Sequence, residues 1–286
     1  MILLDGKNLN KEIITNLKEK VSQLTIKPGL AVVLIGDDPA SEIYVSSKVR
    51  ACQEVGFYSE KIVLPNTVSE KEIFEILDKL NNDKKIHGIL VQFPLPKNLS
   101  YLEDKIINFI NPLKDVDCFH PLNVGKFFAA KRIDINLLVP CTPKGIISLL
   151  KKYQIDLLGR QVVVCGRSNL VGKPVSILLC LEGATVTITH SKTKDLFKIT
   201  SQADVLITAI GKPKYFKKQA IKEGAVVVDV GINRVGKKIY GDVDFEDVKN
   251  KVYAMTPVPG GVGPMTVASL MENILIVYKK QINFQK

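Results

Sequence analysis

The chain has 286 residues, of which 46% are hydrophobic and 24% are charged. This composition is typical of a globular protein with one large or two modest domains, and it excludes a disordered chain or a collagen-like repeat. Lysine and arginine outnumber aspartate and glutamate by 40 to 29, which gives a net charge of +11. Arginine is scarce and the lysines are scattered among acids, so the charge favours an ordinary lysine-rich surface over nucleic-acid recognition.

No targeting or membrane segment is expected. The N-terminus meets Asp5 after a few apolar residues, which does not fit a signal peptide. No apolar run approaches the roughly 20 residues that a membrane helix needs. The five cysteines are odd in number and form no Cys-x-x-Cys pair, which argues against a disulfide framework and against a zinc site. We therefore expect a reduced, cytoplasmic protein with no metal ion and no membrane partner.

The first half of the chain alternates between helical and strand-like segments. Asp38 suits the N-cap of a helix and Pro39 its first turn, and Gly56 ends the same helix. Ser69 followed by Glu72 predicts a capping box that opens the next helix. Periodic apolar residues and continuous hydrophobic runs complete the pattern. The expected helices are 9–24, 39–54 and 69–80, and the expected strands are 29–36, 61–64 and 88–92.

The same alternation restarts near Gly159, after a break that begins at Asp115. Strands that alternate with helices twice over predict two α/β units with parallel sheets. A long helix expected at 265–280 has no strand after it, so we expect it to pack back on the first unit. The other expected elements are strands at 162–165, 185–189, 204–209 and 225–230 and a helix at 175–182.

A loop with two glycines, residues 166–174, lies between a predicted strand and a predicted helix. Glycines at this place let the backbone approach a pyrophosphate, whose charge the N-terminus of the helix favours. Only Gly166 and Gly172 are present, so the spacing is not Gly-x-Gly-x-x-Gly. The context of strand, loop and helix, rather than the motif itself, indicates a dinucleotide site.

The end of the next predicted strand bears on which dinucleotide is bound. Folds that bind NAD place an acidic residue there to hold the ribose hydroxyls, whereas this chain has His190, Ser191 and Lys192. Together with Arg167 and Ser168 in the glycine loop, the missing acid predicts a site for a 2′-phosphate, and hence NADP as cofactor. The alternative is that Arg167 and Lys192 are ordinary solvated surface residues.

Polar residues also follow the predicted strands of the first unit. Tyr44 and Lys48 are four residues apart, so they project from one face of their helix. Gln92 ends a later strand, and Asp115 begins an Asp-x-Asp loop. Each feature has a plain structural explanation, a lysine that covers an aromatic ring or a turn-forming aspartate. Because ligands bind at the carboxyl ends of parallel strands, the four side chains also make a credible polar pocket.

Six segments closely resemble one enzyme family in their order along the chain. The last of them, Thr-Pro-Val-Pro-Gly-Gly-Val-Gly-Pro-Met-Thr, is highly specific. The segments are residues 37–48, 88–96, 114–117, 140–145, 166–168 and 256–266. Together they span nearly the whole chain and resemble the bifunctional methylenetetrahydrofolate dehydrogenase/methenyltetrahydrofolate cyclohydrolase family, the FolD family. Composition and periodicity alone do not indicate folate; the resemblance supplies it.

The resemblance implies two reactions in one cleft. An NADP-dependent oxidation converts 5,10-methylenetetrahydrofolate to 5,10-methenyltetrahydrofolate, and hydrolysis then gives 10-formyltetrahydrofolate for one-carbon metabolism. The hydride step needs positioning more than acid–base help, because the cofactor accepts the hydride. The hydrolytic step is expected to depend far more on a proton-handling side chain.

The resemblance also implies roles for single residues. Lys48 matches the catalytic lysine that manages protons as water attacks the methenyl carbon, and Gln92 is expected to orient it. Tyr44 is expected to stack on the folate ring system. Asp115 matches the carboxylate that grips the pterin by a bidentate contact, with Asp117 supporting its loop. The glycine-rich segment Pro259, Gly260 and Gly261 is expected to border the substrate, and Gly166, Arg167, Ser168, Ser191 and Ile232 are expected to line the cofactor.

Domain boundaries and assembly follow from the same resemblance. Residues 1–137 with 264–286 are expected to form the folate-binding catalytic domain, and residues 138–263 a Rossmann-type NADP-binding domain. A homodimer is implied by the family and by nothing else in the sequence.

The sequence departs from the family pattern at Cys118, which stands where the family usually has glycine. If that position needs a positive φ, a side chain there costs about 1–2 kcal/mol and bears on the placement of Asp115.

Two other classes of function remain open from the residues. Another NADP-dependent dehydrogenase with two α/β domains, acting on amino acids or shikimate-like acids, would explain the glycine loop but not the polar pocket on the first unit. A basic nucleic-acid-binding protein would explain the net charge, and steep salt dependence of DNA retention would reveal it. Arginine is scarce and the sequence has no aromatic-rich basic patch. We therefore expect no nucleic-acid partner.

Overall fold

The structure is a computed structural model that describes residues 1–134, 136–236 and 238–283. The chain divides into two compact units. The three-stranded unit comprises Glu12–Ala130, Asp134–Val139 and Val267–Lys286, and the six-stranded unit comprises Met1–Lys11, Lys131–Ile133 and Pro140–Thr266. Each is named for the parallel sheet at its centre. Within the described ranges, no helix is long and apolar enough to cross a membrane.

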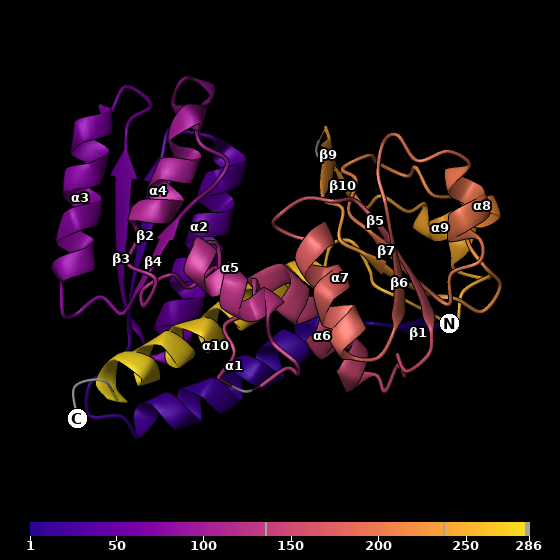
Figure 1. Cartoon of the computed structure of the whole chain (residues 1–286), viewed down its shortest axis with the longest axis horizontal. Helices are drawn as coiled ribbons and strands as arrows, with labels where there is room; N and C mark the ends of the chain where they lie inside the picture. Colours follow the sequence, from indigo (N-terminus) through magenta and orange to yellow (C-terminus); the bar gives the residue numbers. More distant parts are fainter. Residues whose placement is uncertain (135, 237, 284–286) are drawn as a thin grey trace. The chain divides into compact units, whose positions relative to one another are not determined.

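The three-stranded unit has a parallel sheet in the order β3-β2-β4 (Figure 1). Every residue of the central strand is buried, which explains its continuously hydrophobic sequence. Leu30 of the central strand pairs with Ser59 on one side and Gly88 on the other. The strands are β2 (Gly29–Ile35), β3 (Tyr58–Leu64) and β4 (Gly88–Val91). The helices of this part of the chain are α1 (Gly6–Ser22), α2 (Pro39–Val55), α3 (Glu70–Asn82), α4 (Glu103–Phe109) and α5 (Pro121–Phe128), with a 3-10 helix, η1 (Lys97–Leu102).

The helix boundaries in this unit follow local chemistry. The Asp38 side chain accepts a hydrogen bond of 2.8 Å from Ser41 N at the start of α2, and Gly56 ends that helix in the left-handed conformation. Ser69 and Glu72 form the predicted capping box at the start of α3. These start and stop predictions are confirmed.

The C-terminal helix α10 (Val262–Asn283) belongs to the three-stranded unit from Val267 onward. The amide of Asn273 donates to Val116 O at 2.9 Å and to Val139 O at 2.8 Å. Tyr278 Oη donates to Ile26 O at 2.7 Å. These hydrogen bonds confirm that the last helix packs back on the first α/β unit.

The six-stranded unit has a parallel sheet in the order β1-β11-β8-β7-β5-β6. Its strands are β1 (Ile2–Leu3), β5 (Gln161–Cys165), β6 (Thr185–Thr189), β7 (Val205–Thr208), β8 (Val226–Asp229) and β11 (Ala254–Met255). Its helices are α6 (Cys141–Lys152), α7 (Gly172–Leu181), α8 (Leu196–Thr200) and α9 (Phe245–Val248), with η2 (Lys218–Ala220). An antiparallel pair, β9 (Asn233–Val235) and β10 (Lys238–Tyr240), follows β8. Two α/β units with parallel sheets are the predicted fold class, which is confirmed.

The N-terminus lies in the six-stranded unit, because Ile2 pairs with Ala254 and Leu3 with Met255. The predicted folate-binding domain includes this segment, so the contact units and the predicted domains divide the N-terminal residues differently. The predicted domain boundaries at residues 137 and 264 refer to functional domains and therefore stay a prediction.

Candidate active site

The side chains of Lys48 and Gln92 meet at the carboxyl edge of the three-stranded sheet. Lys48 Nζ donates to Gln92 Oε1 at 2.9 Å, and Gln92 Nε2 donates to Phe93 O at 2.7 Å. The second bond fixes the amide so that its oxygen faces the ammonium group. Both side chains are partly buried. The contact between lysine and glutamine that the resemblance implies is present, whereas the catalytic roles stay a prediction.

The chain order explains why these two residues meet. The helix that carries Lys48 begins directly after β2, and Gln92 directly follows β4. Strands β2 and β4 are parallel neighbours, so the chain leaves both strands at the same edge of the sheet. Tyr44 lies one helical turn before Lys48 and is 38% exposed.

Asp115 organises its own loop. Its side chain is 5% exposed and accepts hydrogen bonds from Phe119 N at 3.2 Å, His120 N at 3.0 Å and Asn123 Nδ2 at 2.9 Å. A carboxylate has about four acceptor positions, so these three bonds leave little for a bidentate contact with a ligand. Asp117, two residues later, is more exposed than Asp115.

Cys118 adopts the conformation that glycine would favour at its position. Its φ is +61° and it is fully buried, with Sγ donating to Leu138 O at 3.4 Å. Burial raises the pKa of the Cys118 thiol far above its ordinary value, so the group stays a neutral thiol. The sequence departure is therefore accommodated at a positive φ, with the hydrogen bonds of Asp115 in place.

We expect Cys118→Gly to be more stable than Cys118→Ala by about 1 kcal/mol. Both variants lose the sulfur, but only alanine keeps the strain of a side chain at positive φ. Urea unfolding of the two proteins measures the difference. The matched control is Cys52, buried within helix α2, where glycine should instead be less stable than alanine by about 1 kcal/mol. The same order at both positions would contradict the assignment of strain to Cys118.

The glycine loop of the six-stranded unit is compact because its glycines touch backbone. Gly166 has a φ of +125°, and a Cβ there would collide with Ala209 O. A Cβ on Gly172 would collide with Gly166 O. Ser168 Oγ accepts from Val171 N at 3.1 Å and so supports the start of α7. The two glycines therefore keep the loop tightly folded against the N-terminus of the helix, the arrangement that suits a bound pyrophosphate.

The predicted 2′-phosphate residues lie at one edge of the six-stranded sheet. Strands β5 and β6 are parallel neighbours, with Cys165 paired to Thr189. Arg167 follows the first strand and Ser191 the second, and both side chains are exposed, as is that of Lys192. Cationic and hydroxyl side chains on adjacent loops, without an acid at the end of β6, fit a 2′-phosphate.

Ile232 and the segment 259–261 lie on loops at the same carboxyl edge. Ile232 follows β8 and is 44% exposed. Gly260 has a φ of +113°, and Gly261 N donates to Pro257 O at 2.9 Å in a tight turn. Lys7 N donates to Gly260 O at 2.9 Å, so this turn is held by the first turn of α1. Among the described residues, no cluster of three or more acidic, histidine or cysteine side chains could hold a metal ion.

Sequence reasoning missed two buried acids of the six-stranded unit. Asp229 ends β8 and is 2% exposed, and Asp242 follows β10 and is fully buried. Burial raises the pKa of Asp229 to about 6, although backbone N–H groups partly offset the effect. The sequence did carry a signal for Asp229. This acid directly follows the apolar run 225–228, and a glycine stands two residues after it.

The parallel sheet, the glycine loop and the Lys48–Gln92 pair define an α/β enzyme with a dinucleotide-binding unit. Residues 4–117 match the model of the tetrahydrofolate dehydrogenase/cyclohydrolase catalytic domain, and residues 140–282 match that of the NAD(P)-binding domain. The bifunctional protein FolD of Sulfurihydrogenibium sp. is 52% identical over 287 residues, which cover 99% of each chain.

Two solved structures are similar over their full length. The bifunctional FolD enzyme of Campylobacter jejuni is 47% identical, covers 98% of this chain and 99% of its own, and has a TM-score of 0.92. The Trypanosoma brucei enzyme, crystallised with NADP and an inhibitor, is 34% identical with a TM-score of 0.94, over 99% of this chain and 98% of its own. The chain belongs to the tetrahydrofolate dehydrogenase/cyclohydrolase family. The predictions of family, enzyme class and NADP as cofactor are confirmed, which decides against the other classes that the residues left open.

Proposed function

We infer that the protein oxidises 5,10-methylenetetrahydrofolate with NADP⁺ and then hydrolyses the 5,10-methenyl product to 10-formyltetrahydrofolate. Within a chain of this family, the observation that carries the inference is the Lys48–Gln92 hydrogen bond of 2.9 Å at the carboxyl edge of a parallel sheet. Initial rates with each folate substrate and each nicotinamide cofactor test both activities.

For the hydrolytic half, we propose Lys48 as the proton-handling residue. Water adds to the methenyl carbon and loses a proton, which leaves a neutral carbinol. The bond from this carbon to the ring nitrogen N5 then breaks, N5 gains the hydroxyl proton, and the formyl group stays on N10. One proton is released overall. Lys48 would relay these protons, and Gln92 would hold its ammonium group in place.

For the oxidative half, the protein is proposed to bind and orient rather than to exchange protons. The glycine loop at Gly166 and Gly172 fits a pyrophosphate, because neither position has space for a Cβ. NADP⁺ supplies the hydride acceptor when bound. Arg167, Ser168 and Ser191 would hold its 2′-phosphate, and the exposed Ile232 would line its nicotinamide end.

We expect Arg167→Ala to lower kcat/KM for NADP⁺ by about ten-fold, because it removes one charge-assisted hydrogen bond from an exposed site. kcat/KM for NAD⁺, which has no 2′-phosphate, should change little. The matched control is Arg160→Ala, an exposed arginine directly before β5 at the opposite end of the strand. Equal losses with NADP⁺ and NAD⁺ would rule out a phosphate contact by Arg167.

On the substrate side, we propose a division of work between two aspartates. Asp115 would hold the loop through its bonds to Phe119 and His120, and the more exposed Asp117 would present a carboxylate to the pterin. Tyr44 would stack on the ring, and the turn at 259–261 would border the substrate. This proposal exchanges the roles that the resemblance suggests for the two aspartates.

We expect Asp117→Asn to raise KM for methylenetetrahydrofolate at least about ten-fold, because it weakens a charged contact with the pterin. Asp115→Asn should instead lower the free energy of unfolding by about 1–3 kcal/mol, since it leaves a partly buried N–H group facing an amide NH₂. Steady-state kinetics and urea unfolding of both variants separate the roles. A large rise in KM for Asp115→Asn at unchanged stability would restore it as the direct ligand.

We also propose that the protein is a homodimer in the cytoplasm. A homodimer is implied by the family, and β6 offers a sheet edge with Ile188 at 42% exposure. A monomeric mass by light scattering at micromolar concentration would contradict the homodimer.

A cytoplasmic location fits five cysteines that form no disulfide, all within the described residues. Cell fractionation tests the location, and activity outside the cytoplasm would contradict it.

A further inference from the structure

Asp242 joins two loops at the carboxyl edge of the six-stranded sheet. Its carboxylate accepts from Ile210 N at 2.6 Å, Gly211 N at 3.2 Å and Lys212 N at 2.9 Å. These three N–H groups belong to the loop that follows β7. The same carboxylate accepts from Asn233 Nδ2 at 2.9 Å, on the segment that follows β8. One buried negative charge thus fixes the exits of two adjacent strands.

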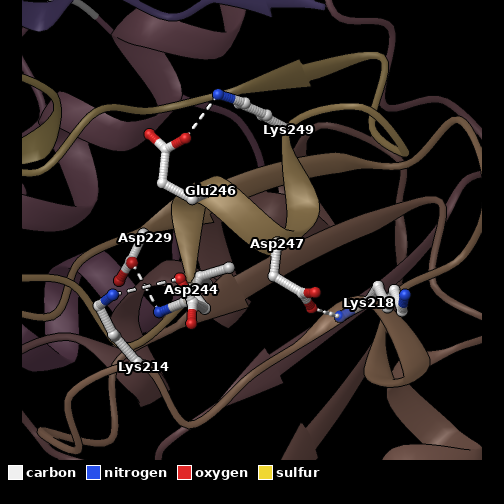
Figure 2. A network of polar contacts seen from close by, with 8 residues as sticks. Lys214, Lys218, Asp229, Asp244, Glu246, Asp247 and Lys249 are labelled. Atoms are coloured by element: carbon white, nitrogen blue, oxygen red, sulfur yellow. Dashed lines mark hydrogen bonds and ion pairs between the residues drawn. The ribbon is translucent and has the colours of Figure 1, made fainter.

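Asp229 fixes the same region from its other side. Its Oδ1 accepts from Thr208 Oγ1 at 3.1 Å, Gly231 N at 3.0 Å and Asp242 N at 2.9 Å. Its Oδ2 accepts from Val243 N at 2.8 Å. Thr208 ends β7, so this carboxylate also binds groups from several segments. Figure 2 shows Asp229 next to the short helix α9, near the ion pair of Lys214 and Asp244.

Two glycines make room for the two carboxylates. A Cβ on Gly231, two residues after Asp229, would collide with the carboxylate of Asp242. A Cβ on Gly241, directly before Asp242, would collide with the carboxylate of Asp229. Each aspartate is therefore packed against a glycine that neighbours the other aspartate in sequence. The backbones of the two segments therefore approach the two carboxylates closely.

We propose that Asp229 and Asp242 are positioning residues for the dehydrogenase, which hold the loop that carries Ile232 in place for the nicotinamide end of NADP. Ile232 lies between Gly231, whose N–H is bound by Asp229, and Asn233, whose amide is bound by Asp242. The two aspartates are nearly or fully buried, so they act through the loops that they bind and not by direct contact with the reacting atoms. The inference rests on the proposed function and adds two residues to it.

The decisive variant is Asp242→Asn. An amide keeps the size of the side chain but presents an NH₂ group to two of the four N–H donors. We expect KM for NADP⁺ to rise at least about ten-fold, by the loss of charge-assisted bonds that fix the loop. The cyclohydrolase rate on preformed methenyltetrahydrofolate, measured without NADP⁺, should stay within about two-fold.

Two further variants make the result decisive. Asn233→Ala removes one donor to Asp242 and leaves both acids in place, and we expect KM for NADP⁺ to rise by about two- to five-fold. It serves as the second test if Asp242→Asn does not fold. Asp204→Asn is the matched control, because Asp204 binds Gln161 N and Lys222 at the opposite end of the sheet. This control should leave KM for NADP⁺ unchanged.

The pH profile gives a readout that a purely structural role would not produce. Burial raises the pKa of Asp229 to about 6, so the group is ionised at neutral pH and gains a proton as pH falls through about 6. We expect KM for NAD⁺ to rise as pH falls through about 6. The Asp229→Asn variant should not show this rise. NAD⁺ is used because the 2′-phosphate of NADP itself titrates near pH 6. Among the described residues, the titratable groups around Asp229 are Asp242, Lys214, Tyr240, Asp244 and Glu246.

The outcomes separate this inference from the proposed function. If the unmodified protein does not reduce NADP⁺ with methylenetetrahydrofolate, the proposed function fails. If it does, and the Asp242→Asn and Asn233→Ala variants keep a normal KM for NADP⁺, the positioning role is wrong. A parallel loss of both activities, together with a lower melting temperature, would also overturn it, because it would show a general structural role.

Discussion

Lys48→Met is expected to lower kcat of the cyclohydrolase by about a hundred-fold or more. Methionine keeps the apolar stem of the side chain but removes the ammonium group that is proposed to relay protons, and a positioned acid–base group contributes about 10²–10⁴-fold. Oxidation of methylenetetrahydrofolate should fall much less, because hydride transfer to the cofactor needs no proton relay. Separate assays of hydrolysis and of NADPH formation measure the two effects.

The matched control for this variant is Lys105→Met. Lys105 lies on helix α4 of the same unit, is largely exposed and pairs with Glu70 at 2.9 Å. An exposed pair of this kind contributes about 0–1 kcal/mol to stability, so both activities should survive its loss. Circular dichroism should show that the Lys48 variant remains folded. Full hydrolytic activity in a folded Lys48→Met protein would refute the role given to Lys48.

Gly172→Ala is expected to raise KM for NADP⁺ by about a hundred-fold or to abolish cofactor binding. The added Cβ would collide with Gly166 O, and its next neighbours are also backbone atoms of the loop, so no side chain can move aside. The glycine loop must open, and the pyrophosphate then loses the close approach of the backbone. Titration of the protein with NADPH measures the affinity directly.

Hydrolysis of methenyltetrahydrofolate by Gly172→Ala should persist, because this reaction uses no cofactor. Gly125→Ala provides the control, since a Cβ at Gly125 meets nothing within 4 Å and its φ is not positive. That substitution lies inside helix α5 and should leave both activities intact. An unchanged affinity for NADPH in Gly172→Ala would show that the glycine loop does not hold the cofactor.

Much of the fold could be predicted because its signals are local. Asp38 and Gly56 bracket helix α2 through a side-chain cap and a left-handed end, and each can be identified in the sequence. The buried strand β2 reads as an unbroken apolar run. Strands β1 and β11 were missed because each has two residues, and pairing between distant segments rather than local sequence makes them strands. Helix α6 was missed because it lies in the stretch between the two recognised units.

Some residues of the candidate site could also be predicted from the sequence, and others could not. Lys48 and Gln92 were predictable because each follows a strand, and parallel strands bring their exits to one edge. The role of Asp115 could not be settled from sequence, since its saturation by Phe119, His120 and other groups depends on how the loop folds. Asp229 was missed because an acid at a strand end has no periodicity, and most of its partners are backbone groups that every sequence has.

The most direct test of the account is the reaction of the purified protein with 5,10-methylenetetrahydrofolate and NADP⁺, followed by the absorbance of NADPH and by chromatography of the folate products. We predict that NADPH forms, that the rate with NADP⁺ exceeds that with NAD⁺, and that 10-formyltetrahydrofolate accumulates. Absence of NADPH with an active preparation of substrate would contradict the central claim.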